Sequence, residues 1–129
     1  MSDFKDTFAI AASGMRAQAS RMKLVAQNIA NADTPGFHRK EVSFEAGGRD
    51  MPEGTVRTGP VRLDRTELSR IYDPSHPMAD TTGHYDGSNV NTLIEIADSR
   101  EAKRGYEANL KMFDQARQMS RSLLELLRK

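Results

Sequence analysis

Apolar side chains recur in alternating steps of three and four residues along both ends of the chain, and this spacing limits the possible folds more than any other feature of the sequence. The first series extends from Asp3 to about Ala32. Steps that average about 3.5 residues place its members on one face of a helix that pairs with a second helix. Asp33-Thr34-Pro35-Gly36 then ends the helix, because proline disfavours helix at the preceding residue and glycine accepts a left-handed turn. The series contains Met1, Phe4, Phe8, Ala11, Met15, Gln18, Met22, Val25, Ile29 and Ala32.

The same period returns at Asn91 and continues almost to Lys129. Asn91 is a suitable N-cap, and the acidic residues near the start and basic residues near the end of this segment match the helix dipole. The apolar side chains form two adjacent stripes, an arc wider than a two-helix seam needs. One stripe contains Ala102, Gly105, Asn109, Met112, Ala116, Met119, Leu123 and Leu126, and the other contains Tyr106, Leu110, Phe113, Leu124 and Leu127.

The expected lengths of these helices bear on function. At 1.5 Å per residue they are roughly 45 Å and 57 Å long, whereas a compact globule of 129 residues has a diameter of about 36 Å. The sequence therefore predicts an elongated molecule in which the terminal helices pair. Such a pair leaves the outer stripe of each helix in water, and contiguous exposed apolar surface usually marks an interaction site. We therefore expect the chain to assemble with other chains.

Residues 37–88 contain most of the glycines and prolines, which predicts loops with short extended segments. The candidate strands lie in Lys40–Phe44, Thr55–Leu63 and Glu67–Tyr72, and Asp86-Gly87 is a candidate hairpin turn. We predict a mainly α fold, with long N- and C-terminal helices paired as a coiled coil and an irregular middle region that contains short β segments. The corresponding domains are residues 1–34, 35–88 and 89–129.

Composition excludes several classes of protein. The sequence has no cysteine, which rules out a disulfide scaffold, a cysteine nucleophile and cysteine-based zinc sites. A net charge of +1 gives no field that would favour nucleic acid or an acidic membrane as a partner. No stretch approaches the roughly 18 apolar residues that span a bilayer, so we expect no direct membrane insertion. Asp3 and Asp6 offset Lys5, and the apolar run that follows is short, so we expect no cleaved secretory signal.

Sequence motifs for enzymatic chemistry are absent. The chain has no phosphate-binding loop, no dinucleotide-binding glycine pattern, no nucleophile elbow and no zinc-protease helix motif. A small metal enzyme would need His76 and His84 to converge with Asp80 or Asp86, but spacing within a loop fixes no such geometry. We therefore predict solvated loop histidines, no cofactor, no metal site and no enzymatic activity.

Two glycines inside the expected helices indicate a close contact between helices. Glycine destabilises an exposed helix by about 1 kcal/mol relative to alanine. Gly14 lies beside the first stripe, and Gly105 lies on a stripe of the second helix. Matching positions in two terminal helices favour sites where another helix backbone passes too closely for a side chain. A leucine at either position is therefore expected to block assembly.

Longer motifs give a more specific indication of function. The stretches from Ser13 to Gln18 and from Asn28 to Arg39 resemble the N-terminal signature of the axial proteins of the bacterial flagellum, the rod and hook family. The likeness covers nearly the whole chain. It departs from the family at His84–Ser88, where an apolar residue and proline are common. Three further motifs are similar to the small proximal rod proteins of that family: Tyr72–Asp80, Asn89–Asn91 and Arg104–Asn109.

This resemblance implies a structural subunit of the flagellar basal-body rod, the drive shaft in the periplasm. In this family the terminal helices pair and form the inner tube of the axial structure, and the neighbours are copies of the chain and other flagellar rod and basal-body proteins. The resemblance also implies export by the flagellar type III apparatus without a cleaved signal peptide. The expected assembly interface contains Phe4, Phe8, Ala11, Gly14, Met15, Gln18, Met22, Val25, Ile29, Asn31, Gly105, Tyr106, Asn109, Met112, Phe113, Ala116, Met119, Leu123 and Leu126.

Two other functions remain open from the sequence. A non-flagellar helical adaptor or chaperone-like binding module would use one apolar groove and stay monomeric or dimeric. A small hydrolase or metal enzyme built on the loop histidines would lose activity when His76 is replaced. In the rod interpretation one chain cannot bury its own stripes, so we expect residues 3–32 and 91–127 to be incompletely ordered in the isolated monomer.

Overall fold

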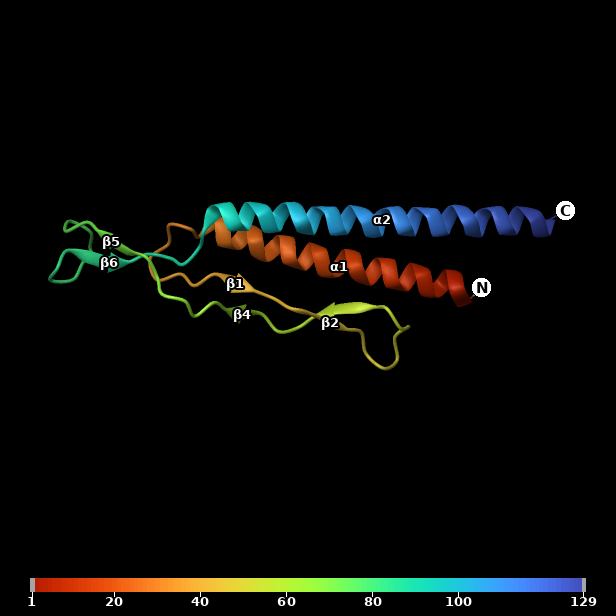
Figure 1. Ribbon diagram of the computed structural model, residues 1–129, viewed down its shortest axis with the longest axis horizontal. Coiled ribbons are helices and arrows are strands. Elements are labelled where there is room, and N and C mark those ends of the chain that lie inside the picture. Colours follow the sequence, from red (N-terminus) through yellow and green to blue (C-terminus); the bar gives the residue numbers. More distant parts are fainter. Residues whose placement is uncertain (1, 129) are drawn as a thin grey trace.

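The computed structural model describes residues 2–128, in which two long helices lie side by side and run in opposite directions (Figure 1). Helix α1 is Ser2–Ala30 and helix α2 is Thr92–Arg128. They contain 29 and 37 residues, so α2 is about 12 Å longer than α1. The C-terminal part of α2 extends past the N-terminal end of α1. The predicted long terminal helices are confirmed, and Met1 and Lys129, which the sequence included in them, lie outside the described residues.

Local sequence accounts for the inner ends of both helices. As predicted, Asn91 caps α2, because its Oδ1 accepts a hydrogen bond from the Leu93 N–H at 3.1 Å. Helix α1 ends at Ala30, slightly before the predicted Ala32, because the chain then passes through a series of turns. Gly36 closes these turns with φ of 76°, the left-handed conformation that glycine adopts most easily.

The middle of the chain contains six short strands in three antiparallel pairs. The first two pairs belong to one long hairpin. Between them, residues 59–61 of the returning strand face residues 42–43, so the returning strand has one extra residue. Pro60 lies in this bulge, where it removes no ladder hydrogen bond. The pairs are β1 (Lys40–Glu41) with β4 (Arg62–Leu63), β2 (Phe44–Ala46) with β3 (Val56–Thr58), and β5 (Arg70–Tyr72) with β6 (His84–Asp86). Short antiparallel strands thus occur in all three predicted segments.

The two hairpins occupy different parts of the molecule. The first folds back along α1, which both β1 and β3 contact. The Val56 N–H donates a hydrogen bond to Ser13 Oγ of α1 at 3.1 Å, and Thr55 beside it is buried. The second hairpin, β5–β6, projects past the start of α2, at the end of the molecule opposite both termini (Figure 1). One hairpin therefore covers part of α1, and the other extends the molecule lengthwise.

The predicted hairpin turn at Asp86-Gly87 is wrong. Asp86 is the last residue of β6, and residues 73–83 connect this strand to β5. A two-residue hairpin turn of that type needs positive φ, and Gly87 is not among the glycines with positive φ. Gly87 instead follows the strand, where its N–H donates a hydrogen bond to the Ser69 carbonyl at 2.7 Å.

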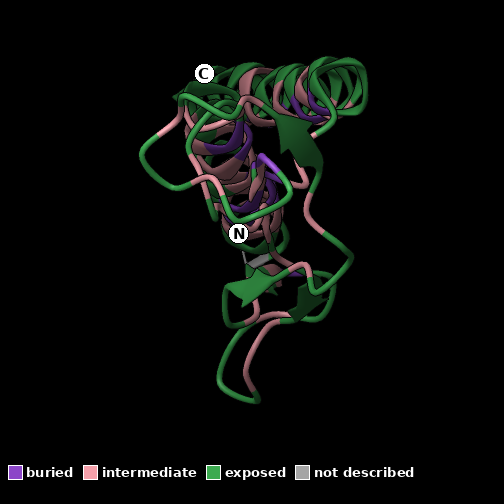
Figure 2. Cartoon of the chain, turned by 90° about the vertical axis from the view of Figure 1, so that its left-hand side faces the viewer, coloured by how far each residue is buried: buried purple, intermediate pink, exposed green. Residues whose placement is uncertain are grey.

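The core of the molecule is narrow. Figure 2 shows buried segments along the helix pair, with extensive exposed surface on the helices and hairpins. An aromatic contact between the two helices joins Phe8 and Phe113, whose ring centroids are 4.9 Å apart. Small side chains let two helices approach closely but bury little apolar area, so they contribute little hydrophobic stabilisation. The buried apolar residues are Ala11, Ala17, Val25, Ala102 and Ala116.

Candidate assembly interface

The residues predicted to form an assembly interface fall into three groups by burial. The buried group contains Ala11, Gly14, Val25 and Ala116. The half-buried group contains Phe4, Phe8, Met15, Gln18, Met22, Asn31, Gly105, Tyr106, Asn109 and Phe113. The exposed group contains Ile29, Met112, Met119, Leu123 and Leu126. The predicted set therefore combines contacts inside one chain with surface that is free to meet other chains.

Both helix glycines lie at close contacts between α1 and α2. A Cβ at Gly14 would lie 2.5 Å from Asn109 Oδ1, and a Cβ at Gly105 would lie 2.5 Å from Gln18 Nε2. The atoms above each glycine are therefore side-chain amide atoms of the chain's own paired helix. The sequence suggested the backbone of a crossing helix there, and that part of the prediction is wrong, because each amide occupies the space that a second backbone would need.

The last turns of α2 form an uncovered apolar surface, and we call residues 119–128 the α2 overhang. Phe8 of α1 contacts Phe113 of α2, so α1 ends before it reaches the last turns of its antiparallel partner (Figure 1). Leu126 and Leu127 are 68% and 73% exposed, and Leu124 is also exposed. Leucines at such exposure on one short helical segment mark an interaction surface.

A second exposed apolar group lies at the start of α2, and sequence reasoning missed it. Leu93, Ile94 and Ile96 are all exposed. They lie outside the two predicted stripes of this helix. The sequence does contain a sign of this group, because three large apolar residues occur within five positions of Asn91. A helix with a single buried face would not need all three.

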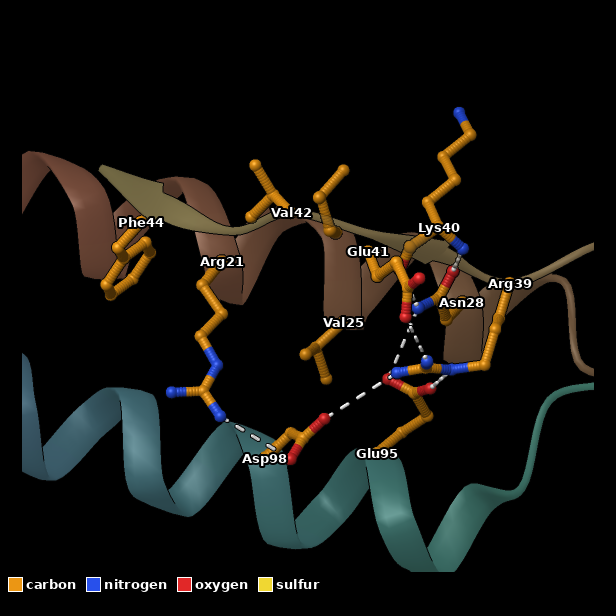
Figure 3. A pocket seen from close by; sticks show the side chains of 11 residues that line it. Arg21, Val25, Asn28, Arg39, Lys40, Glu41, Val42, Phe44, Glu95 and Asp98 are labelled. Carbon is orange, nitrogen blue, oxygen red and sulfur yellow. Dashed lines mark hydrogen bonds and ion pairs between the residues drawn. The ribbon is translucent and has the colours of Figure 1, made fainter. Parts of the chain in front are cut away.

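A buried carboxylate holds the helix pair to the middle region. Glu95 of α2 is fully buried. Its Oε1 accepts a hydrogen bond from Arg39 Nε at 2.7 Å, and its Oε2 accepts one from Asn28 Nδ2 at 3.3 Å (Figure 3). Arg39 also pairs with Asp64 and Asp98 at 3.5 and 3.6 Å. These contacts join α1, the first hairpin and α2 at one point, which we call the junction.

Two asparagines complete the junction through the backbone. Asn28 Oδ1 accepts a hydrogen bond from the Lys40 N–H at 2.8 Å, and Asn28 Nδ2 donates one to the Lys40 carbonyl at 2.9 Å. Asn89 Oδ1 accepts a hydrogen bond from the Arg39 N–H at 2.6 Å, and its Nδ2 donates to the Asp64 carbonyl at 2.8 Å. An asparagine that bonds both the N–H and the C=O of a neighbouring segment fixes that segment as a strand partner would.

The charges at the junction are compensated. Burial alone lowers the pKa of Arg39, but hydrogen bonds to Glu95 and Asp64 outweigh burial and raise it. Hydrogen bonds from Thr66, and then from Arg39, hold the pKa of Asp64 below its usual value. A pocket of about 380 Å³ borders these residues (Figure 3). The arginines that line the pocket, Arg21 and Arg39, pair with neighbouring carboxylates, and these ion pairs hold the helices and the first hairpin together.

The second hairpin holds the remaining candidate residues. His76 stacks on Tyr85 with ring centroids 3.8 Å apart, and His84 meets the edge of Tyr72. Asp80 accepts hydrogen bonds from the Thr82 hydroxyl and from the Arg70 guanidinium, which together hold its pKa well below the usual range. Within residues 2–128, no three or more His, Cys, Asp or Glu side chains are grouped to hold a metal ion.

Comparison with known proteins adds a decisive observation. A family model described as flagella basal body rod protein matches residues 8–38, and one described as the flagellar basal body rod FlgEFG protein C-terminal region matches residues 81–126. Over 128 residues the chain is 43% identical to the flagellar basal-body rod protein FlgC of Agrobacterium fabrum, which covers 92% of this chain and 91% of the relative. The chain belongs to the flagellar basal-body rod protein family. It is also 38% identical to FlgC of Aquifex aeolicus over 88% of this chain and 89% of the relative, and 29% identical to FlgC of Salmonella typhimurium over 92% and 94%.

Membership of the rod protein family confirms the resemblance seen in the sequence motifs. Asn28 and Glu95 of the junction lie within the two matched segments. The adaptor interpretation is not favoured, because the relatives align over nearly their whole lengths and carry the name of a rod protein. Among the described residues, no helix combines the length and apolar character needed to cross a bilayer.

Proposed function

We propose that this chain is a structural subunit of the proximal flagellar rod and assembles through its terminal helices. Identity of 43% to a rod protein over nearly the whole chain carries this proposal. The α2 overhang supports it independently, because Leu124, Leu126 and Leu127 are exposed in the single chain. A subunit that is covered by neighbours on several sides needs apolar surface of this kind.

The terminal segments form the axial core in this proposal. Residues 1–34 and 89–129 supply the core helices, which pair as an antiparallel coiled coil, and residues 35–88 lie outside them. The alternating steps of three and four residues support coiled-coil pairing, and so do the contacts of Phe8 with Phe113 and of Gly14 with Asn109. The predicted interface residues that are exposed, such as Met119 and Leu123, contact neighbouring subunits.

The assembled subunits transmit torque and surround the export channel. Their neighbours are copies of this chain and other flagellar rod and basal-body proteins. The contacts between neighbours are heterologous and do not close into a ring, so they generate a helical assembly. Many parallel helix contacts resist slip under torque better than a few loop contacts. The subunit acts in the periplasmic part of the basal body, and the flagellar type III apparatus exports it without cleavage of a signal peptide.

The exposed apolar stripes also imply that assembly completes folding. Among the described residues the buried apolar side chains are four alanines and one valine, which stabilise two helices of this length only weakly. We propose that residues 3–32 and 91–127 become fully ordered when the subunit docks on its neighbours.

Deletion and complementation test this function. A strain that lacks the gene is expected to be non-motile and to have no complete rods, and the wild-type gene restores both. The chain is expected to sediment with basal bodies isolated from the complemented strain. Normal motility in the deletion strain, or a chain that stays monomeric or dimeric and never sediments with basal bodies, would contradict the proposal.

A further inference from the structure

We infer that two reciprocal glycine–amide contacts fix the register in which α1 pairs with α2. Gly14 receives the side-chain amide of Asn109, and Gly105 receives the side-chain amide of Gln18. In each helix the glycine and the amide residue are four positions apart, so both lie on one face, one turn apart. The antiparallel arrangement therefore brings each glycine opposite the amide of the other helix.

The geometry at the two contacts leaves no space for a side chain. A Cβ at Gly14 would lie 2.5 Å from Asn109 Oδ1 and 2.6 Å from Asn109 Cγ. A Cβ at Gly105 would lie 2.5 Å from Gln18 Nε2 and 2.8 Å from Gln18 Cδ. Cβ atoms do not approach other heavy atoms this closely, so either amide would have to move.

Hydrogen bonding connects the two contacts. Asn109 Nδ2 donates a hydrogen bond to the Gly105 carbonyl at 2.8 Å, so the amide that covers Gly14 is fixed to the glycine that Gln18 covers. Gln18 Oε1 is buried and has no hydrogen-bond partner among the described residues. A buried polar group without a partner destabilises the fold, which makes stability an unconvincing reason for Gln18 at this position. Specificity is the better reason, because polar residues on an apolar seam are known to select one register at the expense of stability.

A shift of one heptad along the seam shows what the contacts exclude. The apolar stripes repeat every heptad, so they alone would tolerate such a shift. After it, Gln18 would face Asp98 or Met112 in place of Gly105, and no glycine would receive its amide. Gly14 would face Ala102 or Ala116, which leaves a gap. Only the observed register places both amides over glycines, and this register leaves the α2 overhang uncovered.

Pair-specific suppression tests the inference in the full-length chain. Gly14→Ala is expected to reduce the amount of chain in isolated basal bodies roughly tenfold, since the added methyl displaces Asn109. Asn109→Ala in the same chain should restore incorporation, whereas Gln18→Ala, which removes the other amide, should not. For Gly105→Ala the roles reverse, so that Gln18→Ala restores incorporation and Asn109→Ala does not. Immunoblots of whole cells control for equal expression.

Cross-linking of introduced cysteines in basal bodies reports the register of the helix pair directly. The natural chain has no cysteine, so each introduced pair supplies the only thiols within it. Phe8→Cys with Phe113→Cys, whose parent rings are in contact, is expected to be joined by a short thiol-specific cross-linker, and Phe8→Cys with Tyr106→Cys, one heptad away, is not. Adding Gln18→Ala and Asn109→Ala together should allow the shifted pair to cross-link.

The outcomes separate this inference from the proposed function. Wild-type incorporation into basal bodies tests the function alone. If Gly14→Ala assembles like the wild type, if either amide truncation rescues both glycine variants equally, or if neither rescues its own partner, the register inference is wrong. Cross-linking of the shifted pair in the otherwise unchanged chain would also overturn it.

Discussion

Glu95 is fully buried and meets Arg39 and Asn28, so the junction depends on single side chains. None of these contacts was predicted from the sequence. The motif that ends in Arg39 indicated a family but not a partner for this arginine. Glu95 lies in the first turn of α2, where glutamate is common at solvent-exposed sites, so hydropathy gave no sign that this carboxylate is buried. Only the fold brings residues 28, 39 and 95 together.

Loss of the buried carboxylate should open the junction. We predict that Glu95→Ala lowers the free energy of opening the junction by about 3 kcal/mol, since Arg39 then loses the buried partner of its ion pair. Hydrogen exchange of the Lys40 amide, measured in basal bodies, should accelerate roughly a hundredfold. The matched control is Glu101→Ala, which removes an exposed partner of Arg21. This variant should change the exchange rate of the Lys40 amide by less than about tenfold. Equal effects of the two variants would show that the buried pair has no special role.

The pKa of Asp80 predicts how the second hairpin responds to acid. Hydrogen bonds from Thr82 and Arg70 hold this pKa well below its ordinary value of 3.8. The carboxylate therefore stabilises the hairpin at every pH above that ordinary value, and the contribution is lost as the pH falls through the lower, folded value. The chemical shift of the Asp80 carboxyl carbon should therefore titrate with a midpoint below 3.8. Asp80→Asn should remove this titration, whereas a wild-type midpoint at or above the ordinary value would contradict the assignment.

At the scale of elements, periodicity predicted the helices well and the connections poorly. Both terminal helices, the Asn91 cap and the left-handed Gly36 follow from local rules that act over a few residues. The Asp86-Gly87 turn was predicted wrongly because Asp86 pairs with Arg70 of β5 inside the second hairpin, a strand pairing that the dipeptide alone does not encode. The pairing of β1 with β4 joins Lys40 to Leu63, which lie far apart in the sequence, and no local pattern encodes it.

The α2 overhang gives a prediction about assembly at this scale. Leu127 is 73% exposed in the single chain, so Leu127→Asp should leave the chain's own fold and expression unchanged. In an assembled rod the aspartate would be buried without a partner, and incorporation into basal bodies should fall by about tenfold or more. Leu127→Met keeps the apolar surface and should assemble normally. If Leu127→Asp is incorporated like Leu127→Met, neighbours do not cover the overhang.

The whole molecule combines long helices with a small core. Its two helices contain 29 and 37 residues, yet in the part of the chain that the structure describes the buried apolar side chains are four alanines and one valine. A subunit of this shape has a large lateral surface for its volume, which suits a rod that must resist torsion through many shared contacts. The same shape leaves the isolated chain with little to hold its helices in place.

Hydrogen exchange of the full-length chain, compared between the dilute monomer and isolated basal bodies, tests most directly whether neighbours complete the fold. We predict little protection of the amides in residues 3–32 and 91–127 in the monomer and strong protection of the same amides in the rod. Strong protection of both segments in the dilute monomer, lost in one cooperative step on heating, would contradict the account.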